Sequence, residues 1–154
     1  MRYAIWTTCM VALVACTPAG NPPRVYPSVN SRATVTVRNL SPSAGARVDG
    51  TTVIDAEVDF TIDSYSTSFE YYLEPLFDSS EGAGRSFNGY DHLTDGYRLR
   101  SGTGSIHVTY PIAHEWKSGK LAKPVHLRFV VMVRTGEHTT MVSGSSTLIE
   151  YVAG

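Results

Sequence analysis

The sequence predicts an all-β fold, a two-sheet antiparallel sandwich of seven or eight strands, with a small β-barrel as the alternative. Apolar and polar residues alternate over residues 51–63 and 124–134, which places one face of each strand in a core and the other in water. Turn signals such as Asp49-Gly50 separate the alternating runs, and only residues 113–117 could form a helical turn. Sandwiches and barrels share this periodicity, so it does not distinguish between them.

Length and composition limit the classes to which the chain can belong. It has 154 residues and a formal net charge of −1, from 13 basic and 14 acidic side chains. This length suits one core and is too short for two full domains. The charge is too low for a surface that follows nucleic acid, so no nucleic-acid partner is expected. A hydrophobic content of 42% excludes a wholly disordered chain.

Residues 1–15 have the features of a secretory signal peptide. Arg2 gives a weakly positive start, and residues 4–15 carry no charge and are mostly apolar. This run is shorter than the roughly 20 residues that a membrane-spanning helix needs. Export, and not a membrane span, is therefore the interpretation of this segment.

The apolar run ends in Leu13-Val14-Ala15-Cys16. This tetrapeptide resembles the lipobox of bacterial lipoproteins. The resemblance implies cleavage before Cys16, acyl chains on that cysteine, and a stable anchor in a membrane of the cell envelope. It also favours the outer membrane, facing the periplasm, because Thr17 stands where the family uses Asp for retention in the inner membrane. In a cell with a single membrane, the domain would face outward instead.

Residues 16–32 are interpreted as the lipidated cysteine and a proline-rich tether. Four prolines fall between residues 17 and 32, which excludes a helix or a central strand. At about 3.1 Å per residue, such a tether spans roughly 50 Å. The alternative is that residues 25–29 pack as an edge strand. The folded domain is expected to cover residues 33–154.

The domain contains six runs with the character of strands. They lie at residues 33–38, 51–63, 69–76, 105–112, 124–134 and 147–152. In the second run, Ile54 and Val58 fall on the core face, whereas Asp55 and Asp59 fall on the water face. The strands on either side of Thr135-Gly136 are expected to form a hairpin.

The opening of the domain carries a second resemblance. Its residues are Ser41-Pro42, Gly45, Val48 and Gly50, followed by the alternating strand from Val53. This pattern is similar to the opening of bacterial immunoglobulin-like or fibronectin type III-like domains, which implies an immunoglobulin-like sandwich. The sequence departs from antibody-type domains because it has no cysteine pair between the sheets, and because Trp116 lies in a predicted loop. The resemblance implies no catalytic residues.

The sequence predicts no enzyme, no metal and no cofactor. Cys9 leaves with the signal and Cys16 carries lipid, so no thiol remains for catalysis. No Gly-x-Ser-x-Gly elbow occurs. His114-Glu115 begins like a zinc-protease motif, but Ser118 occupies the position of the second histidine.

Two groups of charged side chains remain as candidates. His107 and His126 both fall on water-facing strand positions and would approach one another if their strands were neighbours; otherwise they are unrelated surface residues. The acidic face of the second strand comprises Asp55, Glu57, Asp59 and Asp63. It is interpreted as a solvated face that pairs with basic neighbours, or as a negative patch for a basic partner.

The candidate binding region is the glycine-rich stretch of residues 78–104. Its candidate side chains are Phe87, Tyr90, His92, Tyr97, Arg98 and Arg100. Tyr and Arg are enriched where proteins bind partners, and loops on a rigid sandwich commonly carry recognition. The alternative is a hairpin of residues 87–93 against 97–100 whose aromatic side chains cap the core.

These observations lead to a ranked set of functions. The first is a lipid-anchored, non-catalytic module that binds, or structurally supports, an envelope protein complex or a glycan. The second is an envelope inhibitor or chaperone that uses the loop of residues 78–104. The third, a glycan hydrolase, would need two carboxylates held across a cleft, and nothing in the sequence places Asp91 and Asp95 in that way.

Overall fold

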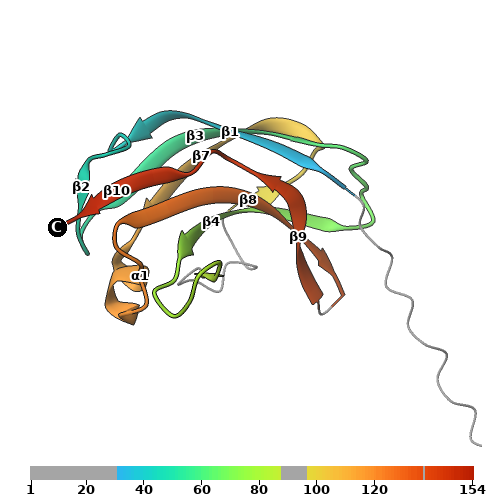
Figure 1. Ribbon diagram of the computed structural model, residues 1–154. Coiled ribbons are helices and arrows are strands. Elements are labelled where there is room, and N and C mark those ends of the chain that lie inside the picture. Colours follow the sequence, from blue (N-terminus) through green and yellow to red (C-terminus); the bar gives the residue numbers. More distant parts are fainter. Residues whose placement is uncertain (1–30, 88–96, 137) are drawn as a thin grey trace, which may run out of the picture.

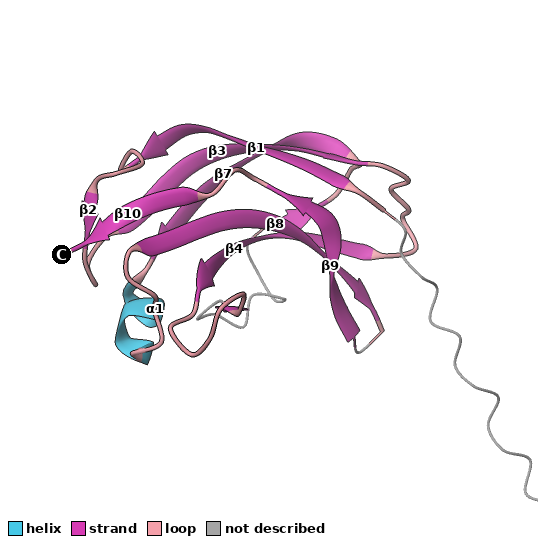
Figure 2. Ribbon diagram, viewed as in Figure 1, coloured by secondary structure: helices cyan, strands magenta, loops and turns pink. Residues whose placement is uncertain are grey.

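The computed structural model describes residues 31–87, 97–136 and 138–154. In this part of the chain, two sheets pack face to face, and a single short helix lies at one end (Figures 1 and 2). The predicted all-β sandwich is confirmed. The two sheets do not close on one another, so the barrel alternative is wrong.

The smaller sheet has three antiparallel strands in the order β1-β3-β7. Their bounds are Ala33–Ser41 for β1, Val53–Ile62 for β3 and Thr103–Pro111 for β7. Ala33 pairs with Ile62, and Ile54 pairs with Tyr110. The central strand β3 is the alternating run that the sequence singles out.

The larger sheet follows the order β2-β10-β8-β4-β5, with β6 also paired to β4 and β9 also paired to β8. The bounds are β2 Arg47–Val48, β4 Glu70–Asp78, β5 Ser86–Phe87, β6 Arg98–Leu99, β8 Val125–Thr135, β9 His138–Ser145 and β10 Ile149–Ala153. All of these pairs are antiparallel except β2 with β10, which is parallel. The ten strands in the described part of the chain include three that are only two residues long, so seven are longer.

The local predictions agree with these elements. Helix α1 spans Ala113–Ser118, which agrees with the helical turn predicted for residues 113–117. It is capped by Gly119, which has φ of 69°. Trp116 therefore lies in this helix, although the sequence placed it in a loop. Strands β8 and β9 form the predicted hairpin, with Thr135 paired to His138. Among the described residues, no helix has the length and apolar character needed to span a membrane.

The core lies between the two sheets. The inward residues of β3 are at most 5% exposed, and those of β8 are at most 1% exposed. They are Ile54, Ala56, Val58, Phe60 and Ile62 on β3, and Val125, Leu127, Phe129, Val131 and Val133 on β8. The alternation in the sequence therefore identifies the buried face of both strands.

The start of β1 and the end of β9 cross closely and join the two sheets. Arg32 forms an isolated parallel bridge with Ser143. Strand β9 bulges against β8, and Gly144 in this bulge has φ of 115°. A Cβ atom on Gly144 would lie 2.0 Å from the backbone oxygen of Ala33, so only glycine fits there without movement of the backbone.

Candidate functional site

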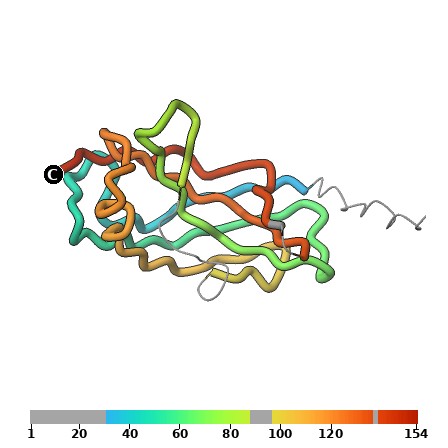
Figure 3. The backbone as a smooth tube through the Cα atoms, turned by 90° about the horizontal axis from the view of Figure 1, so that it is seen from below, coloured from blue at the N-terminus to red at the C-terminus, as the bar shows by residue number. Residues whose placement is uncertain are grey.

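The stretch of residues 78–104 is tied to the edge of β4 at two points. Phe87 pairs with Phe77 near the end of β4, and Arg98 pairs with Tyr72 near its start. The described ends of the expected hairpin therefore pair with β4 and not with each other. Residues 88–96, which include most of the first strand of that hairpin and its turn, lie outside the described residues. The connection from β4 to β5 loops away from the sheet (Figure 3).

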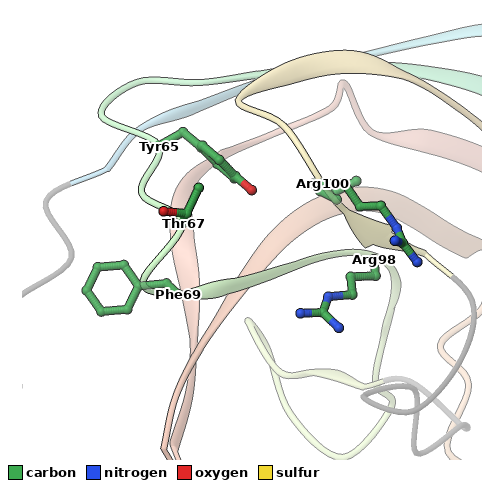
Figure 4. A pocket seen from close by; sticks show the side chains of 6 residues that line it. Tyr65, Thr67, Phe69, Arg98 and Arg100 are labelled. Carbon is green, nitrogen blue, oxygen red and sulfur yellow. The ribbon is translucent and has the colours of Figure 1, made fainter.

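A pocket of about 280 Å³ lies between the β3–β4 loop and β6 (Figure 4). Its lining residues are Tyr65, Thr67 and Phe69 from the loop, and Arg98, Leu99 and Arg100 from β6 and the residue after it. The ring of Tyr65 extends toward the arginine side of the pocket, whereas the ring of Phe69 points away from it (Figure 4). The pocket therefore combines an aromatic wall with two guanidinium groups.

The β3–β4 loop is held by turns and by a close approach of backbone. Ser64 adopts a left-handed φ of 59°, and the backbone N–H of Phe69 donates to the oxygen of Ser66 at 3.2 Å. The ring of Tyr65 stacks at a tilt on that of Tyr71, with 5.0 Å between centroids. A Cβ atom on Gly102 would lie 2.8 Å from the Cβ atom of Tyr65, so glycine at this position makes room for the tyrosine.

One arginine of the pocket, Arg98, shares a glutamate with Arg134 on β8. Arg98 Nη2 lies 2.8 Å from Glu70 Oε1, and Arg134 Nη1 lies 3.9 Å from Glu70 Oε2. The hydroxyl of Tyr72 also donates to Glu70, at 3.1 Å. Arg100 is exposed and forms no ion pair within the described part of the chain. Among the described residues around the pocket, the arginines therefore carry more positive charge than Glu70 neutralises.

The six candidate side chains of the sequence do not form one group. Arg98 and Arg100 line the pocket. Phe87 and Tyr97 are half-buried and pack against the core, and the Tyr97 hydroxyl donates to the oxygen of Thr109 at 2.9 Å. For these two residues, the structure shows the core-capping alternative. Tyr90 and His92 lie outside the described residues.

His107 and His126 lie on different sheets, so they are unrelated residues, and the alternative of a close approach between them is wrong. His107 on β7 lies between Asp55 and Glu57, at 3.2 and 3.0 Å. His126 on β8 lies between Asp78 and Glu150, both at 3.1 Å. No set of His, Cys, Asp and Glu side chains in the described ranges has an arrangement that could hold a metal ion.

The acidic face of β3 is paired with its neighbours, as its interpretation as a solvated face requires. Arg38 on β1 contacts both carboxylate oxygens of Asp59, at 2.5 and 2.6 Å. This hydrogen-bonded guanidinium holds the pKa of Asp59 below its ordinary value of 3.8. His107 contacts two more acids of the face, so most of its charge meets a partner on the same sheet.

The Arg38–Asp59 pair makes a testable contribution to stability in acid. Because the unfolded carboxyl binds its proton at a higher pH than the folded one, the contribution is fully present above the ordinary pKa and is lost as pH falls through the lowered pKa. We expect the urea midpoint to drop between about pH 5 and pH 3, and to drop less in Asp59→Asn and in Arg38→Gln. The Thr51 hydroxyl lowers the pKa of Asp49 in the same direction, so part of the drop remains. An Arg38→Gln profile equal to that of the unmodified chain would contradict this account.

Sequence reasoning missed half of the pocket. It selected Arg98 and Arg100 from the glycine-rich stretch, but it left out Tyr65, Thr67 and Phe69 in the wall that faces them. Two aromatic residues that flank a Ser/Thr-rich turn were the available signal. Comparison with known proteins gives no match to a family model, to a curated protein or to a solved structure.

Proposed function

We propose that the chain is a non-catalytic lipoprotein of the bacterial envelope, anchored by lipid on Cys16, whose sandwich serves as a binding or structural module for a protein complex or a glycan. The anchor is supported by the lipobox-like Leu13-Val14-Ala15-Cys16 at the end of an apolar run. In a double-membraned cell, Thr17 favours the outer membrane and a domain that faces the periplasm.

The observation that carries the binding role is the position of the pocket relative to the tether. The backbone N–H of Asp63 donates to the oxygen of Arg32 at 2.8 Å, which places the first described residues beside the β3–β4 loop. That loop forms one wall of the pocket. The C-terminus lies at the opposite end of the sandwich (Figure 1). A tether that starts at Cys16 thus leads into the end of the domain that bears the pocket.

The strand order supports an immunoglobulin-like domain. Strands β1, β3 and β7 form one sheet, and β4, β8 and β10 lie together in the other. In immunoglobulin-like sandwiches, the first, second and fifth strands likewise face the third, sixth and seventh. Here the short β5 and β6 occupy the edge of β4, between the third strand and β7 in the chain.

The inhibitor or chaperone role is kept as the second candidate because the loop of residues 78–104 is fixed to β4 at both ends. Such a loop has a defined base from which it could enter a cleft in another protein. Replacement of Tyr90 and His92 together by alanine should then abolish capture of the partner, with Tyr97 left unchanged because its ring packs against the core. The hydrolase alternative depends on Asp91 and Asp95, which lie outside the described residues.

Lipid anchoring has a direct test. Cys16→Ser should move the chain from the detergent phase to the aqueous phase in a phase-partition experiment, because the acyl chains supply the membrane affinity. Cys9→Ser is the matched control and should leave partitioning unchanged, since Cys9 precedes the expected cleavage site. Equal partitioning of Cys16→Ser and the unmodified chain would show that the lipoprotein assignment is wrong. Crosslinking of the anchored chain in membranes, followed by isolation, tests for its envelope partner.

A further inference from the structure

Among the described residues, the tether end of the domain carries more positive than negative charge, although the whole chain has a net charge of −1. Its described charged residues are Arg32, Arg98, Arg100 and Arg134 against Asp63 and Glu70. Glu70 is shared between two of the arginines. The described residues at the end that bears the pocket therefore have an excess of two positive charges.

The donors at the pocket suit a phosphate group. A guanidinium offers a planar fork of N–H donors that matches two oxygens of a phosphate, and such contacts are stronger than neutral hydrogen bonds. Among the described residues, Arg100 has no ion pair to break, and Arg98 pairs only with Glu70, which it shares with Arg134. The hydroxyl of Tyr65, on the opposite wall, points toward the arginines and is a further donor (Figure 4).

We propose that this pocket binds a phosphate group, and that in the anchored protein the phosphate belongs to the headgroup of an anionic lipid. The phosphate site follows from the pocket itself, whereas the lipid source rests on the proposed anchoring at Cys16. The tether joins the domain beside the pocket wall, so an anchored domain can turn this end toward the membrane. Tyr65 and Phe69 place aromatic rings at the same end, and aromatic side chains are enriched at membrane interfaces.

The first arm of the test uses a soluble phosphate. The full-length Cys16→Ser chain is titrated with glycerol 3-phosphate and, separately, with glycerol, and binding is followed by calorimetry. We expect glycerol 3-phosphate alone to bind, and the added Arg98→Gln and Arg100→Gln changes to weaken it by at least about tenfold. The matched control adds Arg47→Gln and Lys117→Gln, which remove the same charge from exposed positions on β2 and α1, at the other end of the domain (Figure 1).

The second arm uses flotation with vesicles of phosphatidylcholine, with and without phosphatidylglycerol. All three chains carry Cys16→Ser and the same residues 1–15, so differences between them report only the exchanged charges. We expect binding to the vesicles that contain phosphatidylglycerol, and a loss of about thirtyfold for the Arg98/Arg100 variant, from about 1 kcal/mol for each charge near an anionic surface. The control variant should bind nearly as well as its parent.

Each outcome decides a part of the proposal. Loss of both glycerol 3-phosphate and vesicle binding in the Arg98/Arg100 variant alone supports it in full. Binding of glycerol 3-phosphate without binding to vesicles supports the phosphate site and overturns the lipid source. Equal losses in the control variant show a general charge effect and overturn the site, as does the absence of binding in both arms. Thermal unfolding of each variant shows that it is folded. No outcome depends on lipidation, which the detergent partition of the unmodified chain tests separately.

Discussion

Gly144→Ala is expected to lower the free energy of unfolding by about 3–5 kcal/mol, the largest loss that we predict for a single methyl group. Two effects add at this position. The residue has a left-handed φ of 115°, and the new Cβ atom would lie 2.0 Å from the backbone oxygen of Ala33. Since the clash is with backbone and not with the end of a flexible side chain, either β1 or the bulge of β9 must move. Urea unfolding of the purified chain measures the loss.

Gly45→Ala is the matched control. Gly45 also has a left-handed φ, of 82°, but a Cβ atom there would meet nothing within 4 Å. We expect a loss of about 1–2 kcal/mol, which is the strain of the backbone conformation alone. If the two variants lose equal stability, the close crossing of β1 and β9 does not constrain the fold, and the role that we assign to Gly144 is wrong.

The same crossing shows where prediction from the sequence ends. The strands β3 and β8 were predictable because their alternation records burial on one face, a property that each strand carries in its own residues. Gly144, by contrast, lies in a Ser/Gly-rich stretch that has the composition of a turn. Its function comes from a contact with Ala33, at the other end of the domain sequence. Nothing local to either residue indicates this contact.

The pocket likewise contains residues that the sequence indicated and residues that it did not. Arg98 and Arg100 were predictable because arginine in a glycine-rich stretch favours binding over burial. Tyr65 and Phe69 on the other wall were missed because they precede β4, and they come to lie across the pocket from the arginines only through the pairing of β6 with the start of that strand. The sequence also joined Phe87 and Tyr97 to the arginines. The structure separates them, because their rings pack against the core.

Tyr110→Phe is expected to lower the free energy of unfolding by about 2–3 kcal/mol. Tyr110 is 2% exposed, and its hydroxyl donates to Oε1 of Glu115 on α1, a carboxyl side chain that is fully buried. Removal of the hydroxyl leaves that carboxyl with one donor fewer in a site that water does not reach, and an unsatisfied buried polar group is costly. The bond also fixes α1 against β7, so amide exchange in α1 should become faster.

Replacement of two further tyrosines by phenylalanine also removes one hydroxyl, but we expect different effects on stability. The Tyr72 hydroxyl also donates to a glutamate, Glu70, but that carboxylate is 39% exposed, so Tyr72→Phe should lower stability by less than about 1 kcal/mol. The Tyr71 hydroxyl is buried and has no hydrogen-bond partner in the described part of the chain. Tyr71→Phe should therefore leave stability unchanged or raise it, because only the unfolded chain gains free energy by hydrating that hydroxyl.

Urea unfolding of the three variants should give the largest loss of stability for Tyr110→Phe, a smaller one for Tyr72→Phe and the smallest for Tyr71→Phe. A loss at Tyr71 equal to that at Tyr110 would mean that removal of a hydroxyl disturbs the packing of the rings, and that the bond to Glu115 does not determine the stability of this corner.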